Sequence, residues 1–306
     1  MDMPRIADGA APAEVIDAEL IAVIVAVTED EPRVLTLACG RALPSGPLVP
    51  GHRSLQAGLR SWVEQQTGHP LGYVEQLYPF ADRPGPAARR VSISYLGLTR
   101  EQGGAGGTWR SWYAAFPWED RRTDAAEATL AAIGRRLRRW AQDAPDAAGR
   151  RARRLRADTT FGLGGQPWNE EWVLQRYELL WEAALVAEAG APEPVPGTPM
   201  THDHRRILAT GIARLRAKIK YRPVVFELMP PTFTLSQLQR AVEALAGIAL
   251  HKQNFRRLIE QQRLVEETGA ESRDTGGRPA KLFRFRRDVL AERAVAGSKL
   301  PVARGI

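Results

Sequence analysis

Residues 251–262 combine an apolar stripe with side chains that suit the recognition of base edges in a nucleic acid. The apolar residues recur at helical spacing and are expected to face inward: Phe255, Leu258 and Ile259. Gln253 and Arg257 then point most directly outward. Arginine can bind guanine through two hydrogen bonds, and glutamine can bind adenine in the same way. The segment therefore predicts a helix whose exposed face fits the major groove of a duplex.

The side chains around this face add contacts of the same kind. Asn254 and Arg256 flank it, and Lys252 stands where an amine can hold a phosphate. An RNA target fits less well, because the exposed face carries no aromatic side chain on which a splayed base could stack. We therefore expect this face to contact double-stranded DNA.

A further helix is expected just before this segment. Thr234 and Gln237 fit a capping box ahead of an apolar helical stripe, and Gly247 can end that helix in the left-handed conformation. Two helices joined by a short turn are typical of a helix-turn-helix. The same pattern also occurs in modules that dimerise or dock another protein.

A short hairpin is expected after the recognition segment. Residues 264–265 and 282–285 read as two strands, and the glycines and proline of residues 276–279 supply a turn between them. This arrangement predicts a wing with a basic tip. Its cations are expected to bind DNA phosphates: Arg278 and Lys281.

The distribution of charge supports an anionic partner for this end of the chain. The protein has 306 residues, a net charge of +8 and a pI near 10.0. Residues 201–306 hold 21 basic and 10 acidic residues, whereas residues 1–200 hold 22 and 25. Basic side chains that neutralise phosphates release condensed counterions, which favours DNA binding. An arginine-rich composition without a DNA partner is the alternative interpretation.

The first part of the chain has the pattern of an α+β domain. A helix is expected where apolar residues recur from Leu55 to Val63, and Thr67-Gly68 ends it. Buried or half-buried strands are expected at residues 15–27, 34–38, 71–80, 91–98 and 109–113. We assign residues 1–120 to this domain.

Residues 121–200 have helical patterns and predict an insertion with a linker. One helical face contains Leu130 and Leu137, and a second helix is expected around Tyr177. The arginine-rich run at residues 150–156 can touch phosphates, form a solvated loop or meet an acidic protein neighbour. Four prolines in residues 191–199 exclude a helix there. Residues 201–306 then form a linker helix, near residues 202–220, and the winged helix-turn-helix.

The C-terminal sequence resembles a known family. Residues 221–230 read YRPVVFELMP, residues 254–257 read NFRR, and residues 277–285 read GRPAKLFRF. These segments resemble the Nudix-related transcriptional regulators of NAD metabolism, and the insertion favours the larger subgroup that controls de novo NAD synthesis. The resemblance implies a Nudix-like α/β/α sandwich followed by the winged helix. It also implies a homodimer that represses genes from a palindromic operator and responds to ADP-ribose, NAD or ATP.

The N-terminal half resembles a Nudix box that has lost its carboxylates. Pro50-Gly51 and Thr67-Gly68 match the ends of the box, but Gln65 and Gln66 stand where the family has a pair of glutamates. Only Glu64 remains in that helix, and neutral amides are poor ligands for a hard divalent cation. We therefore expect no catalytic residue, no metal and no enzyme activity. A Nudix hydrolase of ADP-ribose or a related nucleoside diphosphate derivative is the alternative function.

Candidate effector-binding residues are scattered along the first domain. Arg89 and Arg90 precede a strand and can pair with phosphates. Three aromatic residues can stack on adenine, with core or surface packing as the alternative role: Tyr73, Trp109 and Tyr113. The five histidines lack metal-ligand spacing, and a polar contact at the linker helix is expected for His202 and His204. No bound cofactor is expected apart from the nucleotide effector.

The remaining sequence features bear on location. The apolar run at residues 20–27 is far shorter than the roughly 20 residues that a membrane span requires. The N-terminus lacks the pattern of a secretory signal, and the single cysteine, Cys39, cannot form an internal disulfide. These features predict a cytoplasmic protein.

Overall fold

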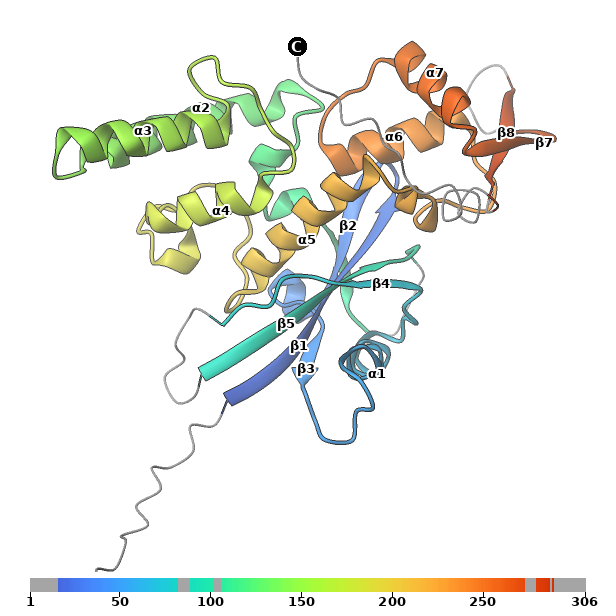
Figure 1. Ribbon diagram of the computed structural model, residues 1–306, viewed down its shortest axis with the longest axis horizontal. Helices are drawn as coiled ribbons and strands as arrows, with labels where there is room; N and C mark the ends of the chain where they lie inside the picture. The colour runs from blue at the N-terminus through green and yellow to red at the C-terminus, as the bar shows by residue number, and fades with distance from the viewer. Residues whose placement is uncertain (1–15, 82–88, 102–105, 273–278, 287, 289–306) are drawn as a thin grey trace, which may run out of the picture.

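The computed structural model describes residues 16–81, 89–101, 106–272, 279–286 and 288 (Figure 1). The first elements are β1 Ile16–Thr28, β2 Glu31–Thr36, η1 Ala38–Gly40, β3 Ser45–Pro47, α1 Leu55–Thr67, β4 Tyr73–Gln76, β5 Arg89–Leu98 and β6 Thr108–Ser111. Between residues 16 and 111, the described residues thus contain the predicted strands and helix, with β4 and β6 shorter than predicted and with β3 in addition.

These strands form one mixed sheet in the order β4-β5-β1-β2-β6, with β3 paired to β1. β1 and β5 run parallel, and the other pairs are antiparallel. β1 lies in the middle, and its residues 20–26 are all buried. A strand covered on both faces needs apolar residues at successive positions, which explains the continuous run LIAVIVA.

Two helices cover the two faces of the sheet. Leu20, Ala22 and Ile24 pack in one cluster with Leu59 and Val63 of α1. The alternate residues of β1 face a larger cluster that includes the helix α5, His204–Ile219. α5 approaches β1 so closely that a Cβ at Gly211 would lie 2.8 Å from a methyl carbon of Val23. The predicted linker helix is therefore also one layer of the first domain.

The segment between the sheet and α5 is helical, as predicted, but it contains more helices than the sequence pattern indicated. The elements are η2 Trp112–Ala114, η3 Pro117–Glu119, η4 Asp124–Ala126, α2 Glu127–Gln142, α3 Ala147–Phe161, α4 Val173–Glu182 and η5 Ala187–Ala189. The arginine run at residues 150–156 lies within α3, so the solvated-loop interpretation was wrong. Asp146 caps α3 by accepting from Gly149 N at 2.6 Å.

The proline-rich stretch at residues 191–199 is not helical, but it is packed against the body of the protein. Val195 is buried and its amide donates to Leu185 O at 2.8 Å. The Thr198 amide donates to Ala114 O at 2.7 Å. A domain boundary near residue 200 stays a prediction.

The C-terminal part has the predicted helices and hairpin. Thr234 and Gln237 form the complete capping box, and Gly247 ends the helix with φ of 72°. An extra bridge joins Phe233 to Phe283 of the second wing strand. The elements are η6 Val224–Glu227, α6 Leu235–Ala246, α7 Lys252–Gln262, β7 Val265–Ser272 and β8 Ala280–Phe285. Within the described residues, every helix is too short or too polar to cross a membrane.

Candidate functional site

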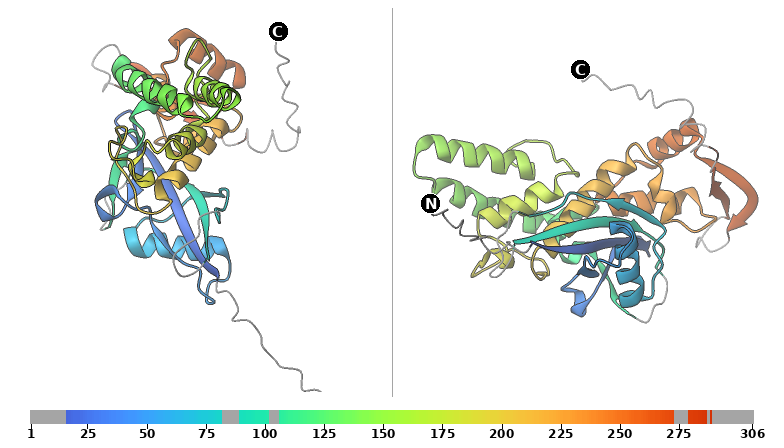
Figure 2. Two further views of the ribbon diagram at one scale, coloured as in Figure 1. Left: turned by 90° about the vertical axis from the view of Figure 1, so that its left-hand side faces the viewer. Right: turned by 60° about the horizontal axis from the view of Figure 1, so that its bottom comes forward.

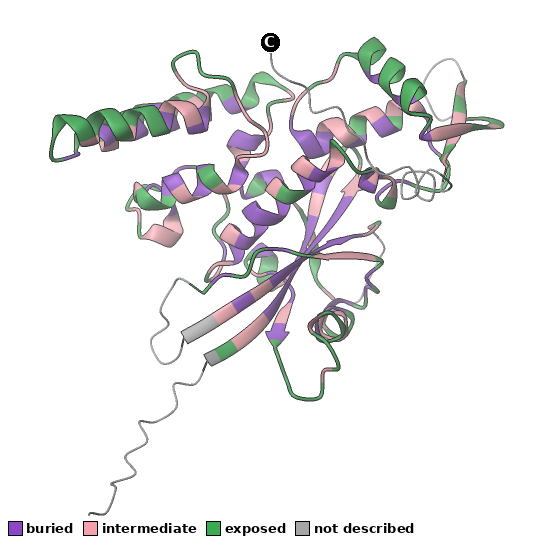
Figure 3. Cartoon of the chain, in the orientation of Figure 1, coloured by how far each residue is buried: buried purple, intermediate pink, exposed green. Residues whose placement is uncertain are grey.

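Helix α7 presents its polar side chains outward, as the sequence predicts. It is anchored by Phe255 and Ile259, which are both buried. Within the described residues, none of the predicted base- or phosphate-contacting side chains of α7 forms a hydrogen bond or an ion pair, and all are exposed: Lys252, Gln253, Asn254, Arg256 and Arg257. These side chains are therefore available to a ligand, and Figure 3 shows the exposed outer surface of α7.

Leu258 departs from the prediction that it belongs to the buried face of α7. Half of this residue is exposed. It lines the rim of a largely apolar cleft of about 580 Å³ between α7, α6 and the end of α5. Helical spacing placed Leu258 beside Phe255 and Ile259, but the cleft leaves this edge of α7 without a packing neighbour.

Two cations of the described part of the wing pair with glutamates of the neighbouring strand, whereas most of the predicted basic tip lies outside the described residues. Lys281 forms an ion pair with Glu267 at 2.9 Å, and Arg284 pairs with Glu266 at 2.6 Å. These cations on β8 are therefore partly neutralised by the neighbouring strand. DNA binding by Lys281 stays a prediction, and Arg278 lies outside the described residues.

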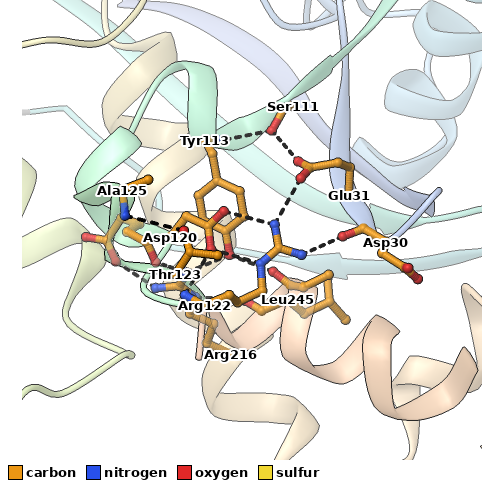
Figure 4. A network of polar contacts seen from close by, with 12 residues as sticks. Asp30, Glu31, Ser111, Tyr113, Asp120, Arg122, Thr123, Ala125, Arg216 and Leu245 are labelled. Carbon is orange, nitrogen blue, oxygen red and sulfur yellow. Dashed lines mark hydrogen bonds and ion pairs between the residues drawn. The ribbon is translucent and has the colours of Figure 1, made fainter. Parts of the chain in front are cut away.

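A buried polar junction connects α6 to the first domain (Figure 4). The Tyr113 hydroxyl donates to Ala244 O at 2.6 Å, and Arg216 Nε of α5 donates to Leu245 O at 2.9 Å. The Arg121 amide donates to the carbonyl of Gly247 at 2.7 Å. The end of the first helix of the helix-turn-helix is thus fixed by residues from three other parts of the chain.

Glu119 is the shared acceptor at this junction. Arg176 of α4 donates to its two carboxylate oxygens at 2.5 and 2.9 Å, and Arg216 donates to one of them at 2.7 Å. All three side chains have no solvent-exposed area. A buried charge that loses its partner costs several kcal/mol, so the three groups depend on one another.

Gly247 allows this close approach. Its φ of +72° is a conformation that favours glycine, and a Cβ there would lie 2.3 Å from Glu119 O and 2.7 Å from Arg216 Nη2. A glycine predicted only as a helix end therefore also lets the helix-turn-helix pack on the junction.

A second polar cluster ties the first domain to α6 at the surface. Arg122 donates to Asp120 and to Glu31 of β2 at 2.9 Å each, and Arg240 of α6 pairs with Asp30 at 2.8 Å. Burial alone would raise the pKa of Asp120, but its hydrogen bonds with Arg122 outweigh that effect and lower it. Arg122 therefore favours the charged form of Asp120.

Tyr73 and Tyr113 both form hydrogen bonds with later parts of the chain. Tyr73 shares Glu75 with Lys218 of α5, so its ring faces the linker helix. Burial raises the pKa of Tyr73 first, and the hydrogen bond to Glu75 adds to this. Tyr113 is buried, with its hydroxyl bonded to Ala244 as above. Their adenine-stacking role stays untested, but the structure gives both a packing role.

The other predicted effector residues lie in different places. Trp109 is half-buried on β6, edge-on to His69 at 5.7 Å between ring centroids. Arg89 and Arg90 begin β5, and their side chains lie outside what the structure describes. His204 is buried and its Nδ1 accepts from the Leu43 amide at 2.7 Å, which is the polar contact expected at the linker helix. An effector-binding role for Arg89, Arg90 and Trp109 stays a prediction.

A polar cleft that sequence reasoning missed lies beside the start of α1. It has a volume of about 400 Å³ and is lined by Ser54, Leu55, Gln56, Val74, Gln76 and Tyr95. Val74 and Gln76 occupy the positions of β4 that alternate with Tyr73 and Glu75, so they belong to the opposite face of the sheet. Alternation along residues 73–76 was the available signal.

The helix α1 uses its polar side chains for internal contacts. The Gln66 amide accepts from Ser45 N at 3.1 Å and donates to Ser45 O at 2.7 Å. Trp62 Nε1 donates to Pro47 O at 3.0 Å, and Glu64 is exposed. Among the described residues there is no group of three or more potential metal-ligating side chains. The absence of metal chemistry stays a prediction, and Gln66 has a structural role at β3.

The architecture defines a class of protein, namely a sheet domain with one helix on each face, joined through its second helix to a winged helix-turn-helix. Residues 225–285 match the family model described as the NrtR DNA-binding winged helix domain. The chain also shares 42% identity over 86 residues with a curated protein of Acinetobacter baylyi named ADPR responsive transcriptional repressor NtrR. That match covers 28% of this chain and 34% of the relative, so it spans about a third of the relative's length.

Solved structures of the same architecture extend the likeness to most of the chain. The crystal structure of Shewanella oneidensis NrtR with a 27mer DNA matches with a TM-score of 0.55 and 19% identity, covering 90% of this chain and 95% of that one. A MutT/nudix family protein from Enterococcus faecalis matches with a TM-score of 0.50 and 15% identity, covering 94% and 90%. Identities this low show the fold alone. The chain therefore shares the fold of these proteins, and its residues 225–285 match an NrtR-type winged helix.

Proposed function

We propose that this protein is a DNA-binding transcriptional repressor of genes for NAD biosynthesis. The observation that carries the proposal is the NrtR winged helix at residues 225–285. The Gln, Asn, Lys and Arg side chains of its α7 are exposed and form no bond with the described part of the chain. Arg257 and Gln253 would read base edges, and Lys252 would hold a phosphate. Two protomers would bind the two halves of a palindromic operator.

The Nudix-like domain would act as the sensor of an adenine-containing nucleotide. The Acinetobacter relative is named as responsive to ADPR, which makes ADP-ribose the first effector to test, with NAD and ATP beside it. The polar cleft next to α1 offers amides at Gln56 and Gln76 and the Tyr95 ring. Those groups suit a ribose hydroxyl or a base edge.

The sensor would lack hydrolase activity. Gln66 holds the backbone of β3 instead of a metal ion, and Glu64 is the one carboxylate left in α1. We expect turnover of ADP-ribose with magnesium far below the ordinary range of about 1–10³ per second. Release of ribose 5-phosphate and AMP within that range would restore the hydrolase alternative.

The buried junction would transmit the effector signal. Tyr113 and Glu119 belong to the first domain and contact α6 directly or through Arg216. A rotation of these groups would move the whole helix-turn-helix of each protomer. An effector that binds the sensor should therefore shift operator affinity by about 1–3 kcal/mol, the usual size of an allosteric coupling.

One set of titrations tests the proposal. A fluorescent duplex from upstream of NAD-synthesis genes is titrated with the full chain, alone and with ADP-ribose, NAD or ATP. We expect the protein to bind this duplex at least about a thousandfold more tightly than an unrelated duplex. One of the three nucleotides should weaken this binding. Equal affinity for both duplexes would refute the repressor function. Unchanged affinity with every nucleotide would refute the sensor.

A further inference from the structure

The hairpin formed by α2 and α3 carries a concentration of positive charge that the proposed function does not use. Residues 127–161 contain nine arginines and four acidic residues, whereas residues 162–200 contain one arginine and six glutamates. Opposite charges are therefore segregated within the insertion. α3 is exposed along most of its length, as Figure 3 shows.

Four of these arginines have no polar contact with any residue that the structure describes. Arg135, Arg138 and Arg139 recur at the spacing of one helical face on α2, and all three are exposed. Arg151 is exposed on α3. Within the described residues, none of the four forms a hydrogen bond or an ion pair. The other five are engaged with backbone carbonyls or carboxylates: Arg136, Arg150, Arg153, Arg154 and Arg156.

The hairpin holds these guanidinium groups on a packed scaffold. Ile133 and Leu137 of α2 are fully buried. Arg153 of α3 lies over the Trp140 ring at 4.6 Å and donates to its carbonyl at 3.0 Å. Arg135, Arg138 and Arg139 are neighbours on one helix, and like charges at this spacing repel one another unless an anionic partner or counterions neutralise them.

The hairpin and α7 lie on the same side of the protein. In Figure 1 both stand on the side of the sheet opposite α1, and the two rotated views in Figure 2 agree. The wing, in contrast, neutralises Lys281 and Arg284 with its own glutamates. The hairpin therefore supplies a further group of unpaired cations on this side of the protein, apart from those of α7.

We propose that Arg135, Arg138, Arg139 and Arg151 bind phosphates of duplex DNA outside the base pairs that α7 reads. This inference rests on the proposed function, because it requires α7 to dock on an operator. Duplex DNA is the favoured occupant because guanidinium groups bind phosphate through paired hydrogen bonds and each contact releases counterions. The contacts would increase affinity without adding sequence preference.

The test compares two duplexes and two double variants. Hydroxyl-radical footprinting with the wild-type protein first defines the operator core. A core duplex and one extended by about 10 base pairs on each side, one helical turn, are then titrated at several salt concentrations. The variants are Arg135→Gln/Arg138→Gln and the matched control Arg41→Gln/Arg53→Gln, which removes two exposed arginines of the first domain. Circular dichroism checks that both fold.

On the extended duplex, the hairpin variant should lower the slope of log affinity against log salt by about 1.8, or about 0.9 per lost phosphate contact. Between about 50 and 200 mM salt this is roughly a tenfold smaller loss of affinity than for wild type. The core duplex should bind both variants alike, and flanking protection should disappear only in the hairpin variant.

Two other results would overturn the proposal while leaving DNA binding intact. Equal salt slopes for the two variants on the extended duplex would show that the hairpin touches no phosphate. A change in the sedimentation of the DNA-free hairpin variant, with an unchanged slope, would assign the arginine face to a partner subunit. Failure of the wild-type protein to bind either duplex specifically would instead refute the proposed function itself.

Discussion

Helices α1 and α7 both carry polar side chains near the surface, but they use them in opposite ways. In α1, Arg60, Trp62 and Gln66 turn their polar atoms to the backbone of neighbouring segments. In α7, the polar side chains of residues 252–254, 256 and 257 form no such bonds within the described part of the chain, and only the apolar Phe255 between them is buried. A helix whose polar groups are already paired supports its own domain. A helix whose polar groups are unpaired and exposed can bind a ligand through them.

The difference extends to the surroundings of the two helices. The hydrogen bonds that α1 forms with described residues lie within its own domain. In contrast, α7 follows a helix whose end is fixed by Tyr113 and Arg216. The free groups of α7 are thus positioned by bonded groups elsewhere. Variants in paired positions should change stability, and variants in unpaired positions should change binding alone.

The largest effect is expected at Glu119, the most heavily shared of the paired groups. Glu119→Gln leaves Arg176 and Arg216 without their buried counter-charge. We expect the free energy of unfolding to fall by about 3–5 kcal/mol, measured by urea denaturation. The exposed pair of Arg284 supplies the control, because Arg284→Gln should cost no more than about 1 kcal/mol. Similar losses in both variants would show that the buried junction contributes no more to stability than an exposed ion pair.

The next effect concerns unpaired residues of α7. Arg257→Ala or Gln253→Ala should weaken operator binding by about 1–3 kcal/mol and relax sequence preference, since each variant loses a base-edge contact. Stability should stay unchanged. Lys252→Ala is the control for a phosphate contact and should weaken all duplexes alike. Titrations against operator and single-base variants decide this, and full discrimination by both α7 variants would refute the assigned face.

A smaller effect on stability is expected at Gln66. Gln66→Ala removes two hydrogen bonds to the Ser45 backbone, which should lower the free energy of unfolding by about 1–3 kcal/mol. Operator affinity should be unchanged when it is measured without urea, where the variant is folded. Gln65→Ala is the neighbouring control, because Gln65 is exposed and bonds only to Ser61 on its own helix. Equal stability of the two variants would show that α1 does not depend on this amide.

The smallest effect is a dependence of stability on pH through Glu75. Burial alone would raise the pKa of Glu75, but hydrogen bonds from Lys218 and Arg214 lower it below the ordinary value of 4.5. A depressed folded-state pKa stabilises the protein above the unfolded value, and this stabilisation is lost as the pH falls below about 4.5. Glu75→Gln should flatten that part of the stability curve. If Glu75→Gln and the wild type lose the same unfolding free energy as the pH falls below about 5, Glu75 does not have a lowered pKa in the folded protein.

Local patterns predicted much of the fold. The capping box at Thr234 and Gln237 and the helix end at Gly68 formed as expected, because they depend on residues close in the sequence. α3 was missed because its arginines obscure the apolar periodicity, and only a few of its residues are buried. Leu258 was misplaced because helical spacing does not show where a packing neighbour is lacking.

The site could be predicted only where it lies on one element. Residues 252–257 share a helical turn or two, so their exposed face followed from the 3.6-residue period. The junction joins Tyr113, Glu119, Arg176 and Arg216 across more than a hundred residues of chain, and no local pattern brings them together. Tyr73 and Tyr113 were proposed as adenine platforms for their ring chemistry, whereas their contacts with α5 and α6 depend on tertiary packing.

The position of α5 has a consequence for how the protein can be divided. Ile207, Leu208 and Ile212 of this helix are buried in the core that includes β1, while Arg216 at its other end bonds to α6. Cutting the chain at residue 201 would therefore strip one side of the sheet and leave an apolar helix in water. The two domains should melt in a single cooperative transition, and neither should be transferable to another scaffold without this helix.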